Sequence, residues 1–235
     1  MEFLKILNDG IIPYLLDYKL SAAVLIGCIL LCMIPAYFLG SLNFAVILSG
    51  RFYGEDVRQK GSGNAGMTNM LRNYGKGAAA LTLLGDVLKA VIACLIGYFA
   101  FGITGAYLAG LFCVLGHMFP IYYHFKGGKG VATTAALMLM VHPPLFLLLL
   151  VVFALIVLST KYVSLASIMC VMIWPLFLSQ METTLGAPVL ISLVIAALVV
   201  FMHRSNIKRL LRGEENKISL GKKKPKAEKE DEENG

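Results

Sequence analysis

Long apolar runs separated by short polar segments limit most strongly what this 235-residue chain can fold into. Hydrophobic residues make up 58% of the sequence and charged residues only 15%, whereas an average soluble domain has roughly 25% charged residues. A helix needs about 20 apolar residues to cross the hydrocarbon core of a membrane. Several runs reach that length, so we expect an all-α, polytopic integral membrane helix bundle.

The apolar runs predict about seven transmembrane helices, two of them short. The first run, from about 20 to 48, becomes polar on one side in its second half. The run at 131–160 is too long for one helix and contains His142-Pro143-Pro144. We expect two shorter helices there, because two prolines cannot continue a helix. The remaining spans are expected at about 78–101, 104–122, 164–180 and 187–203.

Basic residues gather in every second connection. Lys and Arg are frequent in residues 49–77, in residues 123–130 and after residue 203, whereas the connections at 102–104 and 181–186 contain neither. Cytoplasmic loops carry an excess of Lys and Arg, so we expect the N-terminus outside and the C-terminus inside. This orientation accounts for the net charge of +7, and we expect no binding to nucleic acid.

The chain divides into three parts by composition. Residues 1–19 are expected to form an interfacial N-terminal segment, residues 20–215 a single membrane domain, and residues 216–235 a charged, disordered cytoplasmic tail. The His, Asp, Glu and Cys residues have no spacing that is typical of a metal site. We therefore expect neither a metal nor a cofactor.

The polar segment at 49–77 contains the densest group of candidate ligand residues. Its core, Gly61–Gly66 (GSGNAG), combines glycines with hydrogen-bonding side chains, and glycines let successive backbone N–H groups turn toward one anion. Thr68 and Asn69 follow where a helix could start, and a helix N-terminus also favours anions. The alternative is a flexible turn at the membrane surface. Three arginines suited to bidentate phosphate contacts bracket the segment: Arg51, Arg58 and Arg72.

Two further polar clusters are candidates for the same chemistry. Phe125–Gly130 (FKGGKG) has lysines between glycines but lacks the Ser or Thr of a nucleotide-binding loop, so it is either a phosphate contact or a positively charged anchor. His203 and Asn206 lie three residues apart and share a helical face. Ser164 and Ser167 begin a span, where they act as helix caps or as substrate ligands.

Charged residues also occur inside the spans. Asp86 and Lys89 are three residues apart, and intramembrane charges are costly unless they are paired or functional. They are expected to pair with each other or to face the polar site. We interpret His117 as a residue that forms hydrogen bonds between helices.

Five sequence blocks, in this order, are similar to the bacterial acyl-phosphate:glycerol-3-phosphate acyltransferases, the PlsY family. They extend from about residue 40 to residue 215, and Met67 stands where the family more often has a small residue. The blocks are Gly40–Ala45 with Arg51, Gly61–Arg72, Gly116–Pro120 through Phe125–Thr133, Ser164–Ser167, and His203–Glu215.

The resemblance implies a membrane enzyme of phospholipid biosynthesis in the bacterial cytoplasmic membrane, with its active site on the cytoplasmic face. It would move a fatty acyl group from acyl phosphate to the sn-1 hydroxyl of glycerol 3-phosphate, giving lysophosphatidic acid and phosphate. The implied acyl-phosphate-binding residues are Ser41, Gly61, Ser62, Gly63, Asn64, Gly66, Thr68 and Asn69. The implied glycerol-3-phosphate-binding residues are Arg51, Lys126, Lys129, Ser164, His203 and Asn206, and all of these except Lys126 are expected to be catalytic.

The partners expected from the resemblance are acyl phosphate, glycerol 3-phosphate and membrane lipids, with the chain acting as a monomer. An association with the enzyme that makes the acyl phosphate is left open. Two groups stay open as the acceptor of the proton from the sn-1 hydroxyl of glycerol 3-phosphate. They are His203, acting as general base, and a phosphate oxygen of the acyl phosphate. An organic-phosphate transporter is the alternative function. Such transporters are often built from two similar halves, and the sequence contains no internal repeat of that kind.

Overall fold

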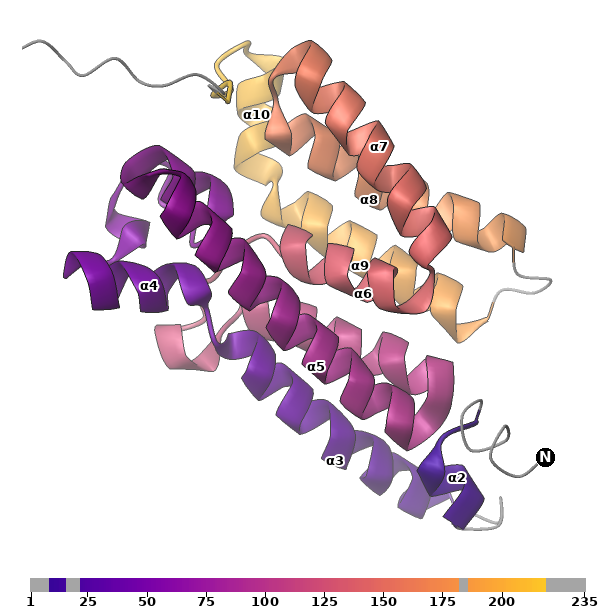
Figure 1. Cartoon of the computed structure of the whole chain (residues 1–235). Helices are drawn as coiled ribbons and strands as arrows, with labels where there is room; N and C mark the ends of the chain where they lie inside the picture. Colours follow the sequence, from indigo (N-terminus) through magenta and orange to yellow (C-terminus); the bar gives the residue numbers. More distant parts are fainter. Residues whose placement is uncertain (1–8, 16–21, 182–185, 219–235) are drawn as a thin grey trace, which may run out of the picture.

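The computed structural model describes residues 9–15, 22–181 and 186–218, and this part of the chain is helical with no strand (Figure 1). The predicted interfacial segment and charged tail therefore lie largely outside the described residues. The helices are α2 (Ile11–Leu15), α3 (Ala22–Ser41), α4 (Phe44–Tyr53), η1 (Val57–Gln59), α5 (Met67–Met118), η2 (Ile121–Tyr123), α6 (Val131–Val141), α7 (Pro143–Thr160), α8 (Val163–Met181), α9 (Ala187–Met202) and α10 (Arg204–Leu211).

The first apolar run forms two helices, so its predicted extent of 20–48 is wrong. The side chain of Asn43 accepts a hydrogen bond from the Val46 N–H at 3.2 Å and caps the start of α4. Helix α3 therefore ends at Ser41, and a separate helix begins at Phe44. Because α4 runs on to Tyr53 and α5 already begins at Met67, the polar segment predicted at 49–77 is a loop only at 54–66.

Helix α5 is a hairpin of two antiparallel arms, as predicted by the break expected between residues 101 and 104. The chain turns at Phe101 and Gly102, and Gly102 has a left-handed φ of 60°. The arms pack closely, since Lys89 Nζ on the first lies 2.9 Å from His117 Nδ1 on the second. Nearer the turn, a Cβ on Gly97 would collide with the backbone of the second arm, so glycine is needed there.

The predicted break at the two prolines is confirmed. Helix α6 ends at Val141, and α7 begins with Pro143 in its first turn, where the missing N–H costs no hydrogen bond. Helix α6 has 11 residues; at about 1.5 Å per residue it is too short to cross a hydrocarbon core of about 30 Å.

The described helices suit a membrane. Four helical stretches are long and apolar enough to cross one, and α9 with α10, bent by 60°, would be a fifth. The four stretches are Ile29–Tyr53, the α5 hairpin with its extension to Tyr123, α7 and α8. Large side chains such as Leu147, Leu155 and Leu158 on α7 are more than half exposed, as expected where lipid replaces water.

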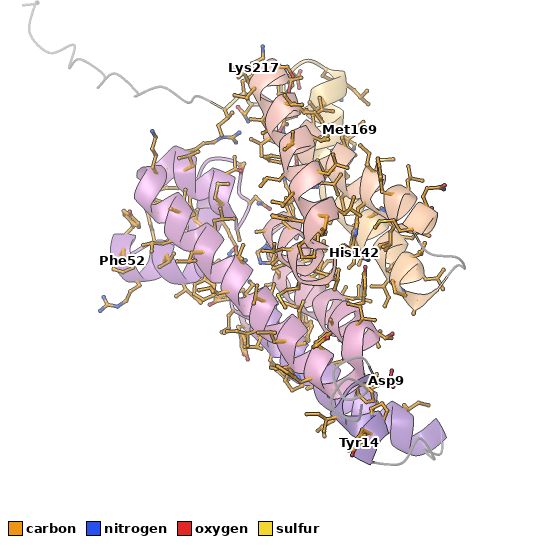
Figure 2. All side chains as sticks on the ribbon, turned by 45° about the vertical axis from the view of Figure 1, so that its right-hand side comes forward. Asp9, Tyr14, Phe52, His142, Met169 and Lys217 are labelled. Atoms are coloured by element: carbon orange, nitrogen blue, oxygen red, sulfur yellow. The ribbon has the colours of Figure 1, made fainter. Side chains whose placement is uncertain are left out.

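The bundle has two groups of helices. Figure 1 shows α3 beside α5 in one group and α6 to α9 in the other. A buried core that includes Tyr107 and Trp174 joins the second arm of α5 to α6, α8 and α9. In Figure 2, Asp9 and Tyr14 lie at the end of the bundle opposite Lys217. The polar connections and α10 gather toward the Lys217 end, where they line one cavity.

Candidate active site

A cavity of about 310 Å³ lies between the beginning of α5 and helices α6 to α10. Part of its wall is polar and comes from the start of α5, the loop before α6, the start of α8 and α10. Asp86 and His117 also border the cavity, and most of the remaining wall is apolar, with Met138, Phe146, Leu149 and Phe153 among its residues. A wall of this kind suits a molecule with a charged head and a hydrocarbon part.

The loop at 54–66 is held in place by one buried asparagine. The Asn69 side chain donates hydrogen bonds to the carbonyl oxygens of Val57 at 2.9 Å and Lys60 at 3.0 Å. Its Oδ1 accepts one from the Ser62 N–H at 3.0 Å. The amide of Asn69 is therefore occupied by the loop, although the residue also borders the cavity.

Several backbone N–H groups of the glycine-rich turn already donate hydrogen bonds within the loop. The N–H of Gly63 donates to Lys60, and the N–H of Gly66 donates to the Asn64 carbonyl. These two N–H groups and that of Ser62 cannot face an anion at the same time. The helix start immediately after the turn stays open to an anion.

Two helix N-termini border the same cavity. Helix α5 follows Gly66 and α6 follows Gly130, and neither of these N-cap residues supplies a side-chain cap. N–H groups of a first helical turn have no partner inside the helix. Thr68 in the first turn of α5 and Ala132 in the first turn of α6 both line the cavity. The positive ends of two helix dipoles therefore favour a negatively charged group there.

A connected hydrogen-bond network joins three separate parts of the chain beside these helix starts. Lys129 Nζ donates to Asn206 Oδ1. Asn206 Nδ2 donates to Glu215 Oε1 at 2.7 Å, and Ser164 Oγ donates to the same oxygen at 2.9 Å. Arg209 Nε bonds the other carboxylate oxygen at 2.7 Å. Glu215 thus fixes the position of Asn206 and Ser164 opposite Lys129.

The imidazole of His203 lines the cavity in the turn between α9 and α10. Its Nδ1 lies 2.8 Å from the Val199 carbonyl oxygen. A carbonyl oxygen only accepts, so Nδ1 carries the proton. In the neutral ring, Nε2 is then left with a lone pair that can accept a proton.

The surroundings of Lys129 and Glu215 change how easily they ionise. Burial lowers the pKa of Lys129 to about 8; the Glu215 carboxylate opposes this shift, and the nearby positive charges of Arg209 and Arg72 add to it. Burial would raise the pKa of Glu215, but hydrogen bonds from Asn206, Arg209 and Ser164 outweigh it and hold that pKa below its usual range. A charged Lys129 is thus ready to meet an anionic substrate near neutral pH.

Three buried ionisable side chains lie directly under these loops. Lys89 Nζ lies 2.7 Å from Asp86 Oδ1, 2.9 Å from His117 Nδ1 and 2.6 Å from the Leu42 carbonyl oxygen. The contacts with Leu42 and His117 are hydrogen bonds, and the contact with Asp86 is an ion pair. The carbonyl of His117 in turn accepts the N–H of Gly128 at 3.0 Å. We call Asp86, Lys89 and His117 the buried triad.

Comparison with known proteins identifies the family. Residues 30–213 match the family model described as glycerol-3-phosphate acyltransferase. A glycerol-3-phosphate acyltransferase of Clostridioides difficile is 45% identical over 197 residues, which cover 81% of this chain and 95% of that protein. One from Halalkalibacterium halodurans is 41% identical over 206 residues, covering 83% and 96% of the two chains. The chain belongs to the glycerol-3-phosphate acyltransferase family.

Two solved structures share the fold. A crystal structure of PlsY, described as an integral membrane glycerol 3-phosphate acyltransferase in its glycerol 3-phosphate form, has a TM-score of 0.77 and 40% identity, and the match covers 81% of this chain and 96% of that one. A lysophosphatidic acid form has a TM-score of 0.74 and 38% identity, covering 81% and 95%. The protein is thus an acyltransferase and a multi-pass membrane protein.

The acyltransferase cavity brings together many of the residues that the sequence predicted, from four distant segments. Their roles stay predictions. The predicted residues on the cavity wall are Ser62, Asn64, Gly66, Thr68, Asn69, Lys129, Ser164, His203 and Asn206.

Five predicted residues lie outside the cavity wall of the acyltransferase. Arg51 is exposed in the last turn of α4 and Lys126 is exposed in the loop before α6. Ser41 is buried, and its hydroxyl donates to the Tyr37 carbonyl at 2.9 Å within α3. Gly61 and Gly63 have left-handed φ values of 57° and 69° and shape the turn instead of lining the cavity.

Sequence reasoning missed Glu215, which is 8% exposed and joins the predicted site residues Ser164 and Asn206 of the acyltransferase. Its signal was an acidic pair, Glu214-Glu215, in a segment that is otherwise strongly basic. It also missed the structural role of Arg58, whose Nη1 donates to the carbonyls of Tyr123 and Lys126 at 3.0 Å each. Arg58 therefore ties the loop at 54–66 to the loop before α6.

Proposed function

We propose that this acyltransferase moves a fatty acyl group from an acyl phosphate to the sn-1 hydroxyl of glycerol 3-phosphate, releasing lysophosphatidic acid and inorganic phosphate. The observation that carries the proposal is a single cavity with two helix N-termini and Lys129 on its polar wall and an apolar wall beside them. Support comes from the relatives named glycerol-3-phosphate acyltransferase and from the glycerol 3-phosphate and lysophosphatidic acid forms of the solved structures.

The orientation in the membrane belongs to the same proposal. Counting both arms of α5, the bundle has seven elements, α3, the two arms, and α6 to α9, with α6 too short to span alone. The basic loops and α10 gather at the cavity end, which we assign to the cytoplasmic face because of their Lys and Arg content. We also propose that the monomer is the active unit.

The two phosphates are assigned to different parts of the cavity. We place the donor phosphate at the start of α5, where Thr68 follows the glycine-rich turn and Ser62 and Asn64 border the wall. Glycerol 3-phosphate is placed against Lys129 and Asn206, with Ser164 and His203 nearby. The acyl chain then lies along the apolar wall.

The reaction needs no enzyme nucleophile, because the acyl phosphate is already activated. The sn-1 hydroxyl oxygen bonds to the acyl carbonyl carbon, the carbon–oxygen bond to phosphate breaks, and phosphate leaves with the bonding electrons. The hydroxyl proton passes to His203 Nε2 or to an oxygen of the departing phosphate. The protein contributes positioning and charge neutralisation.

The proposal is tested with purified protein in lipid nanodiscs, a long-chain acyl phosphate and glycerol 3-phosphate. Phosphate and lysophosphatidic acid are expected in equal amounts, and neither above background when one substrate is omitted. Gly63→Val is the inactive control, because a β-branched residue is strained at a φ of 69°. No product above this control from folded wild-type protein would refute the function.

We expect the rate to fall on the alkaline side of the pH profile. Lys129 has a pKa of about 8, and loss of its proton removes the charge that faces the substrate phosphate. The value of kcat/KM reports on the free enzyme, so it should fall about tenfold per pH unit above pH 8. In Lys129→Arg the guanidinium stays charged, and the fall should move to higher pH. An alkaline limb that is identical in the variant would contradict the assignment.

The same profile separates the two proton acceptors. If His203 is the general base, His203→Gln should lower kcat. The fall in rate at acidic pH that protonation of the imidazole causes should also disappear from the profile. If the donor phosphate accepts the proton, the variant keeps the shape of the profile and only KM rises.

A further inference from the structure

The hydroxyl of Thr134 is a buried hydrogen-bonding group with no partner in the part of the chain that the structure describes. Thr134 lies in α6 and is 2% exposed, and its Oγ1 has no hydrogen bond within the described residues. A threonine inside a helix usually bonds the carbonyl oxygen four residues earlier, which here belongs to Gly130. That oxygen already accepts the Thr134 N–H at 2.9 Å and the Thr133 hydroxyl at 3.0 Å.

This hydroxyl borders the cavity where the wall changes from polar to apolar. About one turn earlier in the chain, just before α6, Lys129 and Gly130 belong to the polar wall beside the helix start. One turn later, Met138 belongs to the apolar wall, which Phe146 of α7 continues. Buried polar groups in proteins nearly always have a partner, so an unpaired one on a cavity wall indicates a ligand atom.

The shape of the donor identifies that atom. In an acyl phosphate, the carbonyl lies between the phosphate and the hydrocarbon chain. With the phosphate at the helix starts and the chain along the apolar wall, the carbonyl lies at the depth of Thr134. This step rests on the proposed function.

We propose that the Thr134 hydroxyl donates a hydrogen bond to the carbonyl oxygen of the acyl phosphate. When the glycerol 3-phosphate hydroxyl attacks the carbonyl carbon, the carbonyl π electrons move to that oxygen, which becomes negatively charged. The electron pair then returns and phosphate leaves. A donor fixed at this oxygen stabilises the charge as it develops, and the first-turn amides of α6 favour the same charge.

Thr134→Val tests the assignment, because valine keeps the shape and removes the hydroxyl. Loss of one oxyanion donor typically lowers kcat by about 100-fold or more, and we expect a fall of about 10- to 100-fold here. The variant should be at least as thermally stable as the wild type, since an unpaired buried hydroxyl is removed. Thr134→Ser, which restores the hydroxyl, should recover most of the rate.

Thr82→Val is the matched control. Thr82 is also a fully buried helical threonine, but its hydroxyl already donates to the Ala78 carbonyl at 2.8 Å and it lies outside the cavity wall. The same substitution should there lower the melting temperature and leave kcat unchanged. Opposite effects at the two positions separate a substrate contact from a packing role.

Three results would overturn the inference while the wild type makes lysophosphatidic acid. One is an unchanged kcat in Thr134→Val. Another is an equal loss of rate in Thr134→Ser, which would indicate packing. The third is a raised inhibition constant for inorganic phosphate with unchanged kcat, which would assign the hydroxyl to a phosphate oxygen. Failure of the proposed function is distinct, because the wild type would then form no product.

Discussion

Lys89→Met is expected to leave very little folded enzyme. The substitution leaves the Asp86 carboxylate, 2% exposed, without its ammonium partner at 2.7 Å. Removing one partner of a buried ion pair typically destabilises a protein by about 3–5 kcal/mol. The loss should appear as a large fall in the melting temperature and in the monodisperse fraction in detergent.

A double variant separates charge from packing. Asp86→Leu with Lys89→Met removes both charges, and stability should return to within about 2 kcal/mol of the wild type, because apolar residues of similar volume often replace a buried pair well. Lys76→Met, on an exposed position of the same helix, should change stability by less than about 0.5 kcal/mol. A double variant as unstable as Lys89→Met would contradict the expected role of the pair.

Gly128→Ala is expected to lower kcat/KM by about 100-fold, the loss that a displacement of about 1 Å can cause in a catalytic group. A Cβ at this position would overlap the ring of His117 in the buried triad and the backbone oxygen of Ala65 in the glycine-rich turn. Both neighbours are buried, so the chain at Gly128 has to move, and Lys129 moves with it. Steady-state kinetics at saturating acyl phosphate measure the loss.

The control for this substitution is Gly77→Ala. A Cβ at Gly77 meets no atom within 4 Å, and alanine is the better helix former by up to about 1 kcal/mol. This variant should keep full activity with equal or higher stability. Wild-type kinetics in Gly128→Ala would contradict the prediction, because the added Cβ would then leave Lys129 in its working position.

Local chemistry explains the parts of the fold that sequence reasoning predicted. The break between α6 and α7 follows from Pro143, whose ring cannot continue a helix. The break in α5 at Gly102 follows from a residue that adopts a left-handed φ without strain. The break between α3 and α4 was not predicted. It depends on one side-chain cap, that of Asn43, and a single polar residue does not interrupt the apolar pattern of the sequence.

The sequence by itself determined the membrane class, the family and the segments that carry polar chemistry, because hydropathy and motif blocks are read along one chain. The tertiary structure decided which polar atoms are used and which stay available. Asn69 and Arg58 hold loops together, and Glu215 holds Asn206 and Ser164 in place. The Thr134 hydroxyl has no partner among the described residues, because the Gly130 carbonyl oxygen already accepts two hydrogen bonds. Each donor or acceptor forms only a limited number of hydrogen bonds. The role of each polar group therefore depends on neighbours that only folding brings within reach.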